Sequence, residues 1–261
     1  MQDLNKLLQA IEKTGYPIEL RVGSIFTKDG WNVQYNRYYV DKDEVKAREI
    51  DINAFKNTHS ENENLVVGLH ILCEVKNSPK PWIVFSTQKG ILDGGGWLRL
   101  HYILGMERGI VPFHVLEAKS SISKFSRIGR SYCEGFKLDA EKSEIFKALT
   151  SVVKASEDCL EKNEKAAKEH KDKQQRLLCF LDHLIVLNGL LYEAYLDEND
   201  ELYIHEIDHA LVSFGYISVE YQRYRYLVDL VTLKELPNLL SAKRKWLESI
   251  KDAVVKNLRS K

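Results

Sequence analysis

The pattern of hydrophobic and polar positions in the first ninety residues predicts two helices followed by three strands. Apolar residues recur at intervals of three and four over residues 4–11 and again over 18–26, which is typical of amphipathic helices. Apolar and polar residues alternate over 31–35 and 48–53, as in half-buried strands. The next strand, residues 65–76, is apolar on both faces for most of its length, which indicates a central position in a sheet.

The rest of the chain predicts further strands around one long helix. Residues 88–137 are irregular and rich in glycine and serine, so we expect an insertion with one or two short helices. Residues 139–176 predict one long helix whose nearly all-charged second half projects into solvent. Further strands are predicted at residues 184–187, 191–196, 202–207, 210–217 and 226–232, before a basic helix at 236–258. This order predicts a single α/β domain over residues 1–261, with a mixed central β-sheet flanked by helices.

Composition excludes several classes of protein. The chain has 261 residues, of which 44% are hydrophobic, and this is too apolar for intrinsic disorder. No uncharged apolar run approaches the roughly 18 residues of a membrane span, and the first residues lack the features of a signal peptide. We therefore expect a cytoplasmic protein without membrane contact. The 38 basic and 38 acidic residues balance, which argues against a protein that coats nucleic acid but allows a local basic groove.

Charged residues near the ends of two predicted strands are the main candidates for chemistry. Alternation places Asp51 on the face opposite Ile50 and Ile52. The same period places Glu74 and Lys76 side by side at the end of the apolar strand. Burial of these charges is costly unless they are paired or bind a metal.

A divalent cation would explain these charges. Asp51 and Glu74 supply the carboxylate oxygens that Mg²⁺ prefers, and we expect the Val75 carbonyl as a third ligand. We expect Mg²⁺, with Mn²⁺ able to replace it. Lys76 would then lie beside the attacking water, where it orients that water or helps to remove its proton. Hydrolysis of a phosphodiester requires this combination of an activated nucleophile and positive charge.

Asp51 and the triplet Glu74-Val75-Lys76 resemble the motif of the PD-(D/E)xK nuclease superfamily, which has the restriction endonuclease-like fold. In many members a preceding helix contributes a further acid, and Glu19 is placed to do so here. The resemblance covers residues 15–85. The proline in the family's name is absent, because Ile50 precedes Asp51.

The resemblance implies a Mg²⁺-dependent phosphodiesterase with a restriction endonuclease-like core. Its catalytic residues would be Asp51, Glu74, Lys76 and Glu19, and its metal ligands Asp51, Glu74 and Val75. By analogy with the family we expect an endonuclease rather than an exonuclease, with DNA as substrate and a role in bacterial restriction or antiviral defence.

Basic residues in two stretches are candidates for binding the phosphate backbone. They are Lys119, Lys124, Arg127 and Arg130 in the irregular segment, and Lys243 and Arg244 in the last helix. Either stretch is also compatible with an ordinary solvated surface. The outer part of the long helix, residues 155–176, is a candidate docking element for a partner protein or a second copy of the chain.

Two alternatives stay open. A catalytically silent nucleic-acid-binding or scaffold module would keep the same fold, although the intact Asp51, Glu74 and Lys76 argue against it. Residues 205–209 also match H-E-x-x-H, the pattern of zinc metalloproteases. That pattern needs a helix to bring both histidines to one zinc ion. Because the flanking sequence predicts strands, a zinc protease ranks third.

Overall fold

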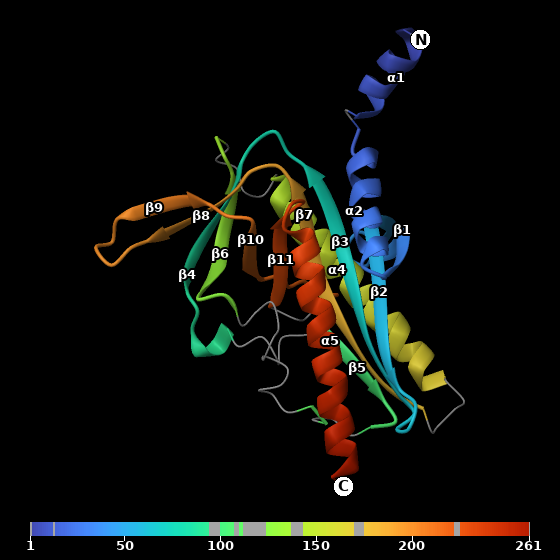
Figure 1. The fold of residues 1–261 in the computed structure, drawn as a ribbon. Coiled ribbons are helices and arrows are strands. Elements are labelled where there is room, and N and C mark those ends of the chain that lie inside the picture. Colours follow the sequence, from blue (N-terminus) through green and yellow to red (C-terminus); the bar gives the residue numbers. More distant parts are fainter. Residues whose placement is uncertain are drawn as a thin grey trace.

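The protein is built around one large sheet with helices on both faces (Figure 1). The computed structural model describes residues 2–12, 14–93, 100–106, 110–111, 124–136, 143–169, 175–221 and 225–260. Its helices are α1 (Gln2–Glu12), α2 (Tyr16–Lys28), α4 (Glu144–Glu169) and α5 (Leu236–Arg259), with a 3₁₀ helix η1 (Ile91–Asp93). No helix among these described residues is long and apolar enough to cross a membrane.

Eleven strands form the mixed sheet. They are β1 (Asn32–Asp41), β2 (Lys46–Ser60), β3 (Leu65–Asn77), β4 (Trp82–Gln88), β5 (Leu100–Leu104), β6 (Arg127–Glu134), β7 (Arg176–Asn188), β8 (Leu191–Leu196), β9 (Leu202–Glu206), β10 (His209–Phe214) and β11 (Tyr226–Thr232). Their order is β1-β2-β3-β7-β11-β10-β6-β4-β8-β9, and β5 pairs with the first half of β7. The predicted mixed α/β class is confirmed.

The centre of the sheet is the parallel pair β3 and β7. Their ladder runs without interruption from Leu65 opposite Arg176 to Asn77 opposite Asn188. Parallel neighbours need a crossover connection, and α4 lies in the chain between them. Most residues of both strands are buried, because helices cover the sheet on both faces, as is usual for parallel strands.

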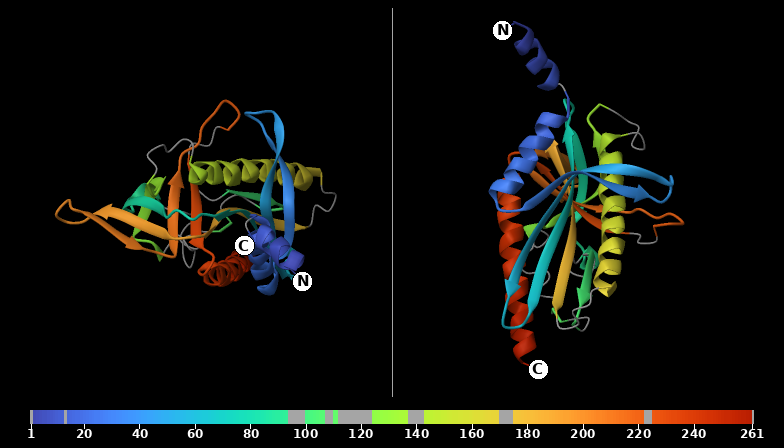
Figure 2. Two further views of the ribbon diagram at one scale, coloured as in Figure 1. Left: turned by 90° about the horizontal axis from the view of Figure 1, so that it is seen from above. Right: turned by 90° about the vertical axis from the view of Figure 1, so that its right-hand side faces the viewer.

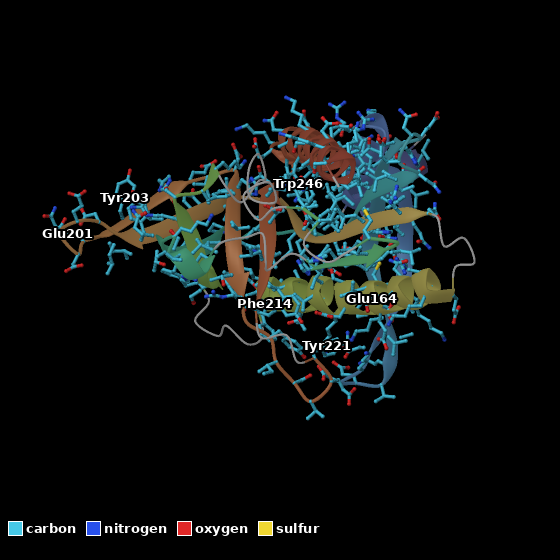
Figure 3. All side chains as sticks on the ribbon, turned by 90° about the horizontal axis from the view of Figure 1, so that it is seen from below. Glu164, Glu201, Tyr203, Phe214, Tyr221 and Trp246 are labelled. Carbon is cyan, nitrogen blue, oxygen red and sulfur yellow. The ribbon has the colours of Figure 1, made fainter. Side chains whose placement is uncertain are left out.

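Two hydrophobic cores lie on opposite faces of the sheet. One packs under α2 and α5 and includes Trp246 (Figure 3), whose ring centroid lies 4.9 Å from that of Phe180. The other packs under α4 and includes Leu149 and Val152. Seen edge-on, α2 and α5 lie on one side of the sheet and α4 lies on the other (Figure 2).

The hairpin of β1 and β2 twists sharply at Asp51. Ile52 is buried in the core under α2 and α5, whereas Ile50 is buried in the core under α4. Asn36, opposite Asp51 in the register of β1, has a left-handed φ of 50°. The expectation that Ile50 and Ile52 share one face is therefore wrong, because the strand rotates between them.

A buried lysine attaches the outer half of this hairpin to α4. Lys154 lies with its Nζ 2.7 Å from Asp41 Oδ1 and 2.8 Å from Asp43 Oδ2. The rings of Tyr216 and Tyr221 lie 5.3 and 5.4 Å from the same nitrogen. Two carboxylates and two aromatic faces thus offset the cost of burying one ammonium group.

Two segments differ from their predictions. Residues 88–137, expected to be an irregular insertion, contain β5 and β6, and β6 lies inside the sheet between β10 and β4. The predicted helix 139–176 is shorter, because α4 ends at Glu169 and Arg176 already begins β7. The candidate docking region 155–176 is likewise wrong in its first part, where Ala155, Cys159 and Leu160 belong to the core.

The substitution Lys154→Met tests how firmly the hairpin is attached to α4. Methionine keeps the length of the side chain but leaves Asp41 buried, with Arg48 as its remaining cationic partner among the described residues. We expect the free energy of unfolding, measured by urea denaturation at pH 7, to fall by about 3 kcal/mol. The control Lys147→Met, at an exposed lysine of the same helix that pairs with Glu144, should cost under about 1 kcal/mol. Equal losses for the two variants would contradict this account.

Candidate active site

Asp51 lies where β2 separates from β3. The pairing of these strands ends at Ile52 opposite Cys73. One residue further along, the Val75 N–H donates to Asp51 Oδ2 at 2.7 Å. The carboxylate of Asp51 thus replaces the main-chain acceptor that β2 no longer supplies, and this bond fixes its position beside the end of β3.

Glu74 and Lys76 form a close ion pair at the same end of β3. Lys76 Nζ donates to Glu74 Oε2 at 2.6 Å, and the Glu74 side chain is only 5% exposed. Burial raises the pKa of Glu74 to about 7, against the opposing effect of Lys76, and the charges of Asp51 and Glu19 raise it further. Burial alone would lower the pKa of Lys76, but Glu74 and Asp51 overcome this and raise it. Lys76 is therefore a cation at neutral pH.

Glu19 approaches this pair from α2. It lies in the first turn of the helix, half-buried, with its Oε1 near the Cα of Gly15. Its pKa is raised, first by burial and then by the charge of Asp51, while Lys76 lowers it. The pKa of Asp51 is raised as well, chiefly by burial, against the effects of Lys76 and the Val75 N–H.

The four predicted catalytic residues are thus brought together from three elements. We call Glu19, Asp51 and Glu74, with Lys76, the carboxylate cluster. Three carboxylates share one lysine, and the pKa of each carboxyl is raised. A site of this kind has too little positive charge of its own to keep all three carboxylates ionised.

A glycine allows α2 to approach the sheet at this point. A Cβ atom on Gly23 would lie 2.0 Å from Tyr35 Oη and 2.4 Å from Tyr35 Cζ. A larger residue at position 23 would therefore displace the ring of Tyr35, which lies on β1. Gly23 lies one helical turn after Glu19, so this close contact sets the distance of Glu19 from the sheet.

The donor set is compatible with Mg²⁺ but does not form a complete cage. Among the residues that the structure describes, no three His, Cys, Asp or Glu side chains converge as a metal site. Mg²⁺ is usually held by one or two carboxylates, with water and substrate oxygens completing its shell. Asp51 and Glu74 match that requirement, and a divalent cation would offset the cost of burying their charges, which is the main cause of their raised pKa values.

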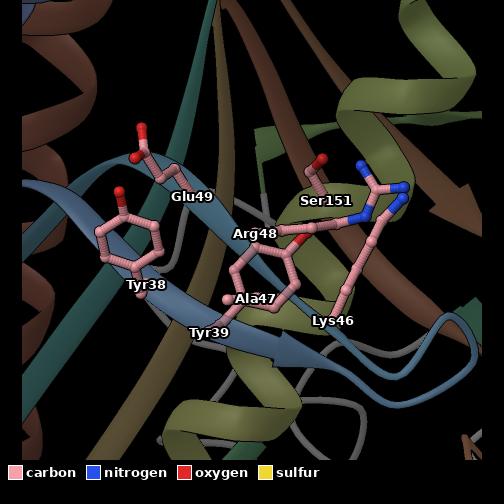
Figure 4. A pocket seen from close by; sticks show the side chains of 7 residues that line it. All are labelled: Tyr38, Tyr39, Lys46, Ala47, Arg48, Glu49 and Ser151. Atoms are coloured by element: carbon pink, nitrogen blue, oxygen red, sulfur yellow. The ribbon is translucent and has the colours of Figure 1, made fainter.

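Sequence reasoning missed the residues beside the cluster. A cavity of about 400 Å³ lies between the outer half of the β1–β2 hairpin and α4 (Figure 4). Its lining comprises Tyr38, Tyr39, Lys46, Ala47, Arg48, Glu49 and Ser151. Burial raises the pKa of Tyr39 to about 12 despite its hydrogen bond with Ser151, and the charge of Glu74 contributes. The register of the hairpin brings most of these residues together, and Ser151 joins them from α4, more than a hundred positions later in the chain. Local sequence patterns do not reveal contacts of this kind.

The residues predicted to contact nucleic acid do not form one site, and several of them already have partners within the protein. Lys243 is wrong as a phosphate contact, because its side chain is 1% exposed and its Nζ lies 2.5 Å from Asp182 and 2.7 Å from Asp229. Arg130 is already held by both carboxylate oxygens of Asp93. The remaining candidates are Lys124 near Glu235, Arg127 stacked 3.5 Å from the Tyr195 ring, Arg244 near Asp29, and Lys119, which lies outside the described residues.

The H-E-x-x-H match does not form a helix. His205 belongs to β9 and His209 begins β10, which confirms the expectation of strands. His209 is buried with its Nε2 2.8 Å from Asp229 Oδ1, whereas His205 lies 3.7 Å from Glu193. The two rings therefore have separate partners and lack the shared helical face that a zinc protease needs.

Comparison with known proteins adds no assignment: no family model, curated protein or solved structure matches the chain.

Glu74→Gln tests the buried carboxylate through the dependence of stability on pH. The pKa of Glu74 lies at about 7 in the folded protein, above its ordinary value of 4.5. Ionisation of Glu74 therefore disfavours the folded state as the pH rises from about 5 to 8. In EDTA, we expect the native protein to lose stability relative to Glu74→Gln over this range, by up to about 3 kcal/mol.

The measurement is urea denaturation of both proteins at several pH values. Glu201→Gln, which changes an exposed glutamate in the β8–β9 hairpin, serves as the control. Its free energy of unfolding should depend on pH in the same way as that of the native protein. Parallel curves for Glu74→Gln as well would show that Glu74 is not the buried, proton-binding group described here.

Proposed function

We propose that the protein is a metal-dependent nuclease that hydrolyses phosphodiester bonds of nucleic acid. The observation that supports this most strongly is the convergence of Glu19, Asp51, Glu74 and Lys76 at the end of β3. Carboxylates that need a cation, next to a lysine that stays protonated, are suited to phosphoryl chemistry because both the nucleophile and the developing charge require stabilisation.

The order of elements also supports a restriction endonuclease-like core. Helix α2, the antiparallel strands β1, β2 and β3, helix α4 and the parallel strand β7 occur in this order along the chain, with β4, η1, β5 and β6 inserted between β3 and α4. This is the arrangement expected from the resemblance of Asp51 and residues 74–76 to the PD-(D/E)xK superfamily. Because fold and motif point to the same site, we prefer a nuclease to other hydrolases.

Each residue of the cluster has a distinct role in this proposal. Asp51 and Glu74, with the Val75 carbonyl, would hold Mg²⁺ or Mn²⁺. The cation would polarise the phosphate and lower the pKa of the attacking water. Glu19 would support the metal from α2. Of the two roles predicted for Lys76, its raised pKa favours orienting the water and stabilising negative charge on the phosphate over accepting a proton.

The wider setting of the activity rests on analogy with the superfamily. We propose DNA as the substrate, endonucleolytic cleavage, and a cytoplasmic role in bacterial restriction or antiviral defence. The alternative is a silent nucleic-acid-binding or scaffold module. It draws support from the lack of a complete three-residue metal cage among the described side chains.

The proposal predicts metal-dependent cleavage that depends on Asp51 and Lys76. The native protein should cleave supercoiled plasmid or labelled oligonucleotides with Mg²⁺ or Mn²⁺, and EDTA should abolish cleavage. Asp51→Asn keeps an oxygen to accept the Val75 N–H but loses the charge, and Lys76→Ala removes the cation. Each should lower the rate by about 100-fold or more, because charge stabilisation at the reacting phosphate is lost.

Glu201→Gln is the matched control for these substitutions. It changes a carboxylate at the outer end of the β8–β9 hairpin (Figure 3), at the other end of the strand order from β2 and β3, and should retain the native rate. Cleavage that survives Asp51→Asn and Lys76→Ala would place the active site elsewhere. Binding without cleavage, for the native protein on plasmid, single-stranded DNA and RNA, would favour the silent module.

A further inference from the structure

We propose that the carboxylate cluster acts on single-stranded nucleic acid, and that exposed tyrosines around the cluster, Tyr38 above all, hold the strand by stacking on its bases. This inference rests on the proposed nuclease function and specifies its substrate class. Three observations support it, namely the placement of the tyrosines, the cavity beside Tyr38, and the state of the nearby basic residues.

Three tyrosines on α2 and on β1, the strand that pairs with β2, keep much of their surface in solvent. Tyr16 is 66% exposed, Tyr38 is 62% exposed and Tyr35 is 39% exposed. Tyr16 lies one helical turn before Glu19 on α2, and Tyr35 packs on Gly23 one turn after it. Isolated exposed apolar side chains need no explanation, but large rings gathered around one group of buried carboxylates indicate a binding surface.

Tyr38 is the best placed of the three. It pairs with Glu49 across the β1–β2 hairpin, and its hydroxyl group is hydrogen-bonded to the Glu49 carboxylate. Glu49 lies two residues before Asp51 on β2, so Tyr38 is one side chain removed from the cluster. The ring of Tyr38 is 62% exposed, which leaves it accessible to a base that stacks on it.

The cavity beside Tyr38 has room for part of a nucleotide chain. Its volume of about 400 Å³ falls within the range of small-molecule sites. Tyr38 and Tyr39 line it from β1, and Ser151 lines it from α4 (Figure 4). Glu49 lines the cavity and lies two residues before Asp51 on β2, so the cavity and the cluster are neighbours along that strand, and one strand of nucleic acid would reach both.

The basic residues nearby favour a single strand over a duplex. Non-specific binding of duplex DNA relies on lysine and arginine side chains that neutralise many phosphates. Lys46 is paired with Glu44, and Arg48 is paired with both Glu44 and Asp41. On α2, Arg21 lies 2.8 Å from Glu12. With these cations already partnered, base stacking, which is independent of sequence, is the stronger source of affinity at this surface.

The test compares binding of a labelled oligonucleotide of about 12 nucleotides as a single strand and as a duplex. Binding is measured by fluorescence anisotropy in EDTA, in the full-length Asp51→Asn protein so that no cleavage interferes. We expect tighter binding of the single strand. Adding Tyr38→Ala should weaken single-strand binding about 10-fold, because one stacking contact is lost, and should leave duplex binding unchanged.

Two further variants separate stacking from other effects. Tyr38→Phe keeps the ring and should retain most of the affinity. Tyr203→Ala removes a ring that is 51% exposed on β9, at the other end of the strand order from β1, and should have no effect. Circular dichroism of each variant confirms that it is folded.

Duplex binding as tight as single-strand binding, or an unchanged single-strand affinity in Tyr38→Ala, would overturn the inference. The cleavage assay separates this from a failure of the proposed function. Metal-dependent cleavage that prefers duplex DNA and tolerates Tyr38→Ala would retain the nuclease and reject the single-strand substrate. Absence of cleavage on every substrate would reject the nuclease itself.

Discussion

The parallel pairing of β3 with β7 is the constraint on which the rest of the structure depends. The ladder continues to the last residue of both strands, and helices bury both faces of the sheet. Glu74 and Lys76 therefore lie on a strand whose other side chains are mostly apolar and buried, where ionised groups are poorly solvated. Their short ion pair and the raised pKa of Glu74 follow from this position. The proposed chemistry would profit from this position, because charge at the end of a central strand is held rigidly.

The second constraint is the divergence of β2 from β3 at Asp51. Once the main-chain pairing ends, the carboxylate of Asp51 binds the Val75 N–H, and the strand rotates so that Ile50 and Ile52 enter opposite cores. Asp51 thus lies at the end of the pairing between β2 and β3, at the twist of β2, and beside Glu74. The outer hairpin, directed across α4 by this twist, brings the tyrosine-lined cavity to the same site.

Local patterns predicted much of the fold and the cluster itself. Periodicity identified the strands β8 and β11 with the bounds that the structure has. The strand patterns around Asp51, Glu74 and Lys76 indicated one site, and the resemblance to a known motif added Glu19 to it. Long-range packing decided what local patterns missed. Lys243 looked like a surface cation of a basic helix, yet Asp182 and Asp229 on distant strands bury it. Likewise, β5 and β6 exist because they pair with β7, β10 and β4 rather than with each other.

The most direct test of the central claim is to locate the metal. Crystals of the protein grown with Mn²⁺ would be measured at the manganese absorption edge, where anomalous scattering identifies the ion. We predict a peak within coordination distance of Asp51 and Glu74, at about 2.0 to 2.3 Å from their oxygens, that is lost in Asp51→Asn. A fully occupied manganese ion elsewhere, with none between these two carboxylates, would contradict the account.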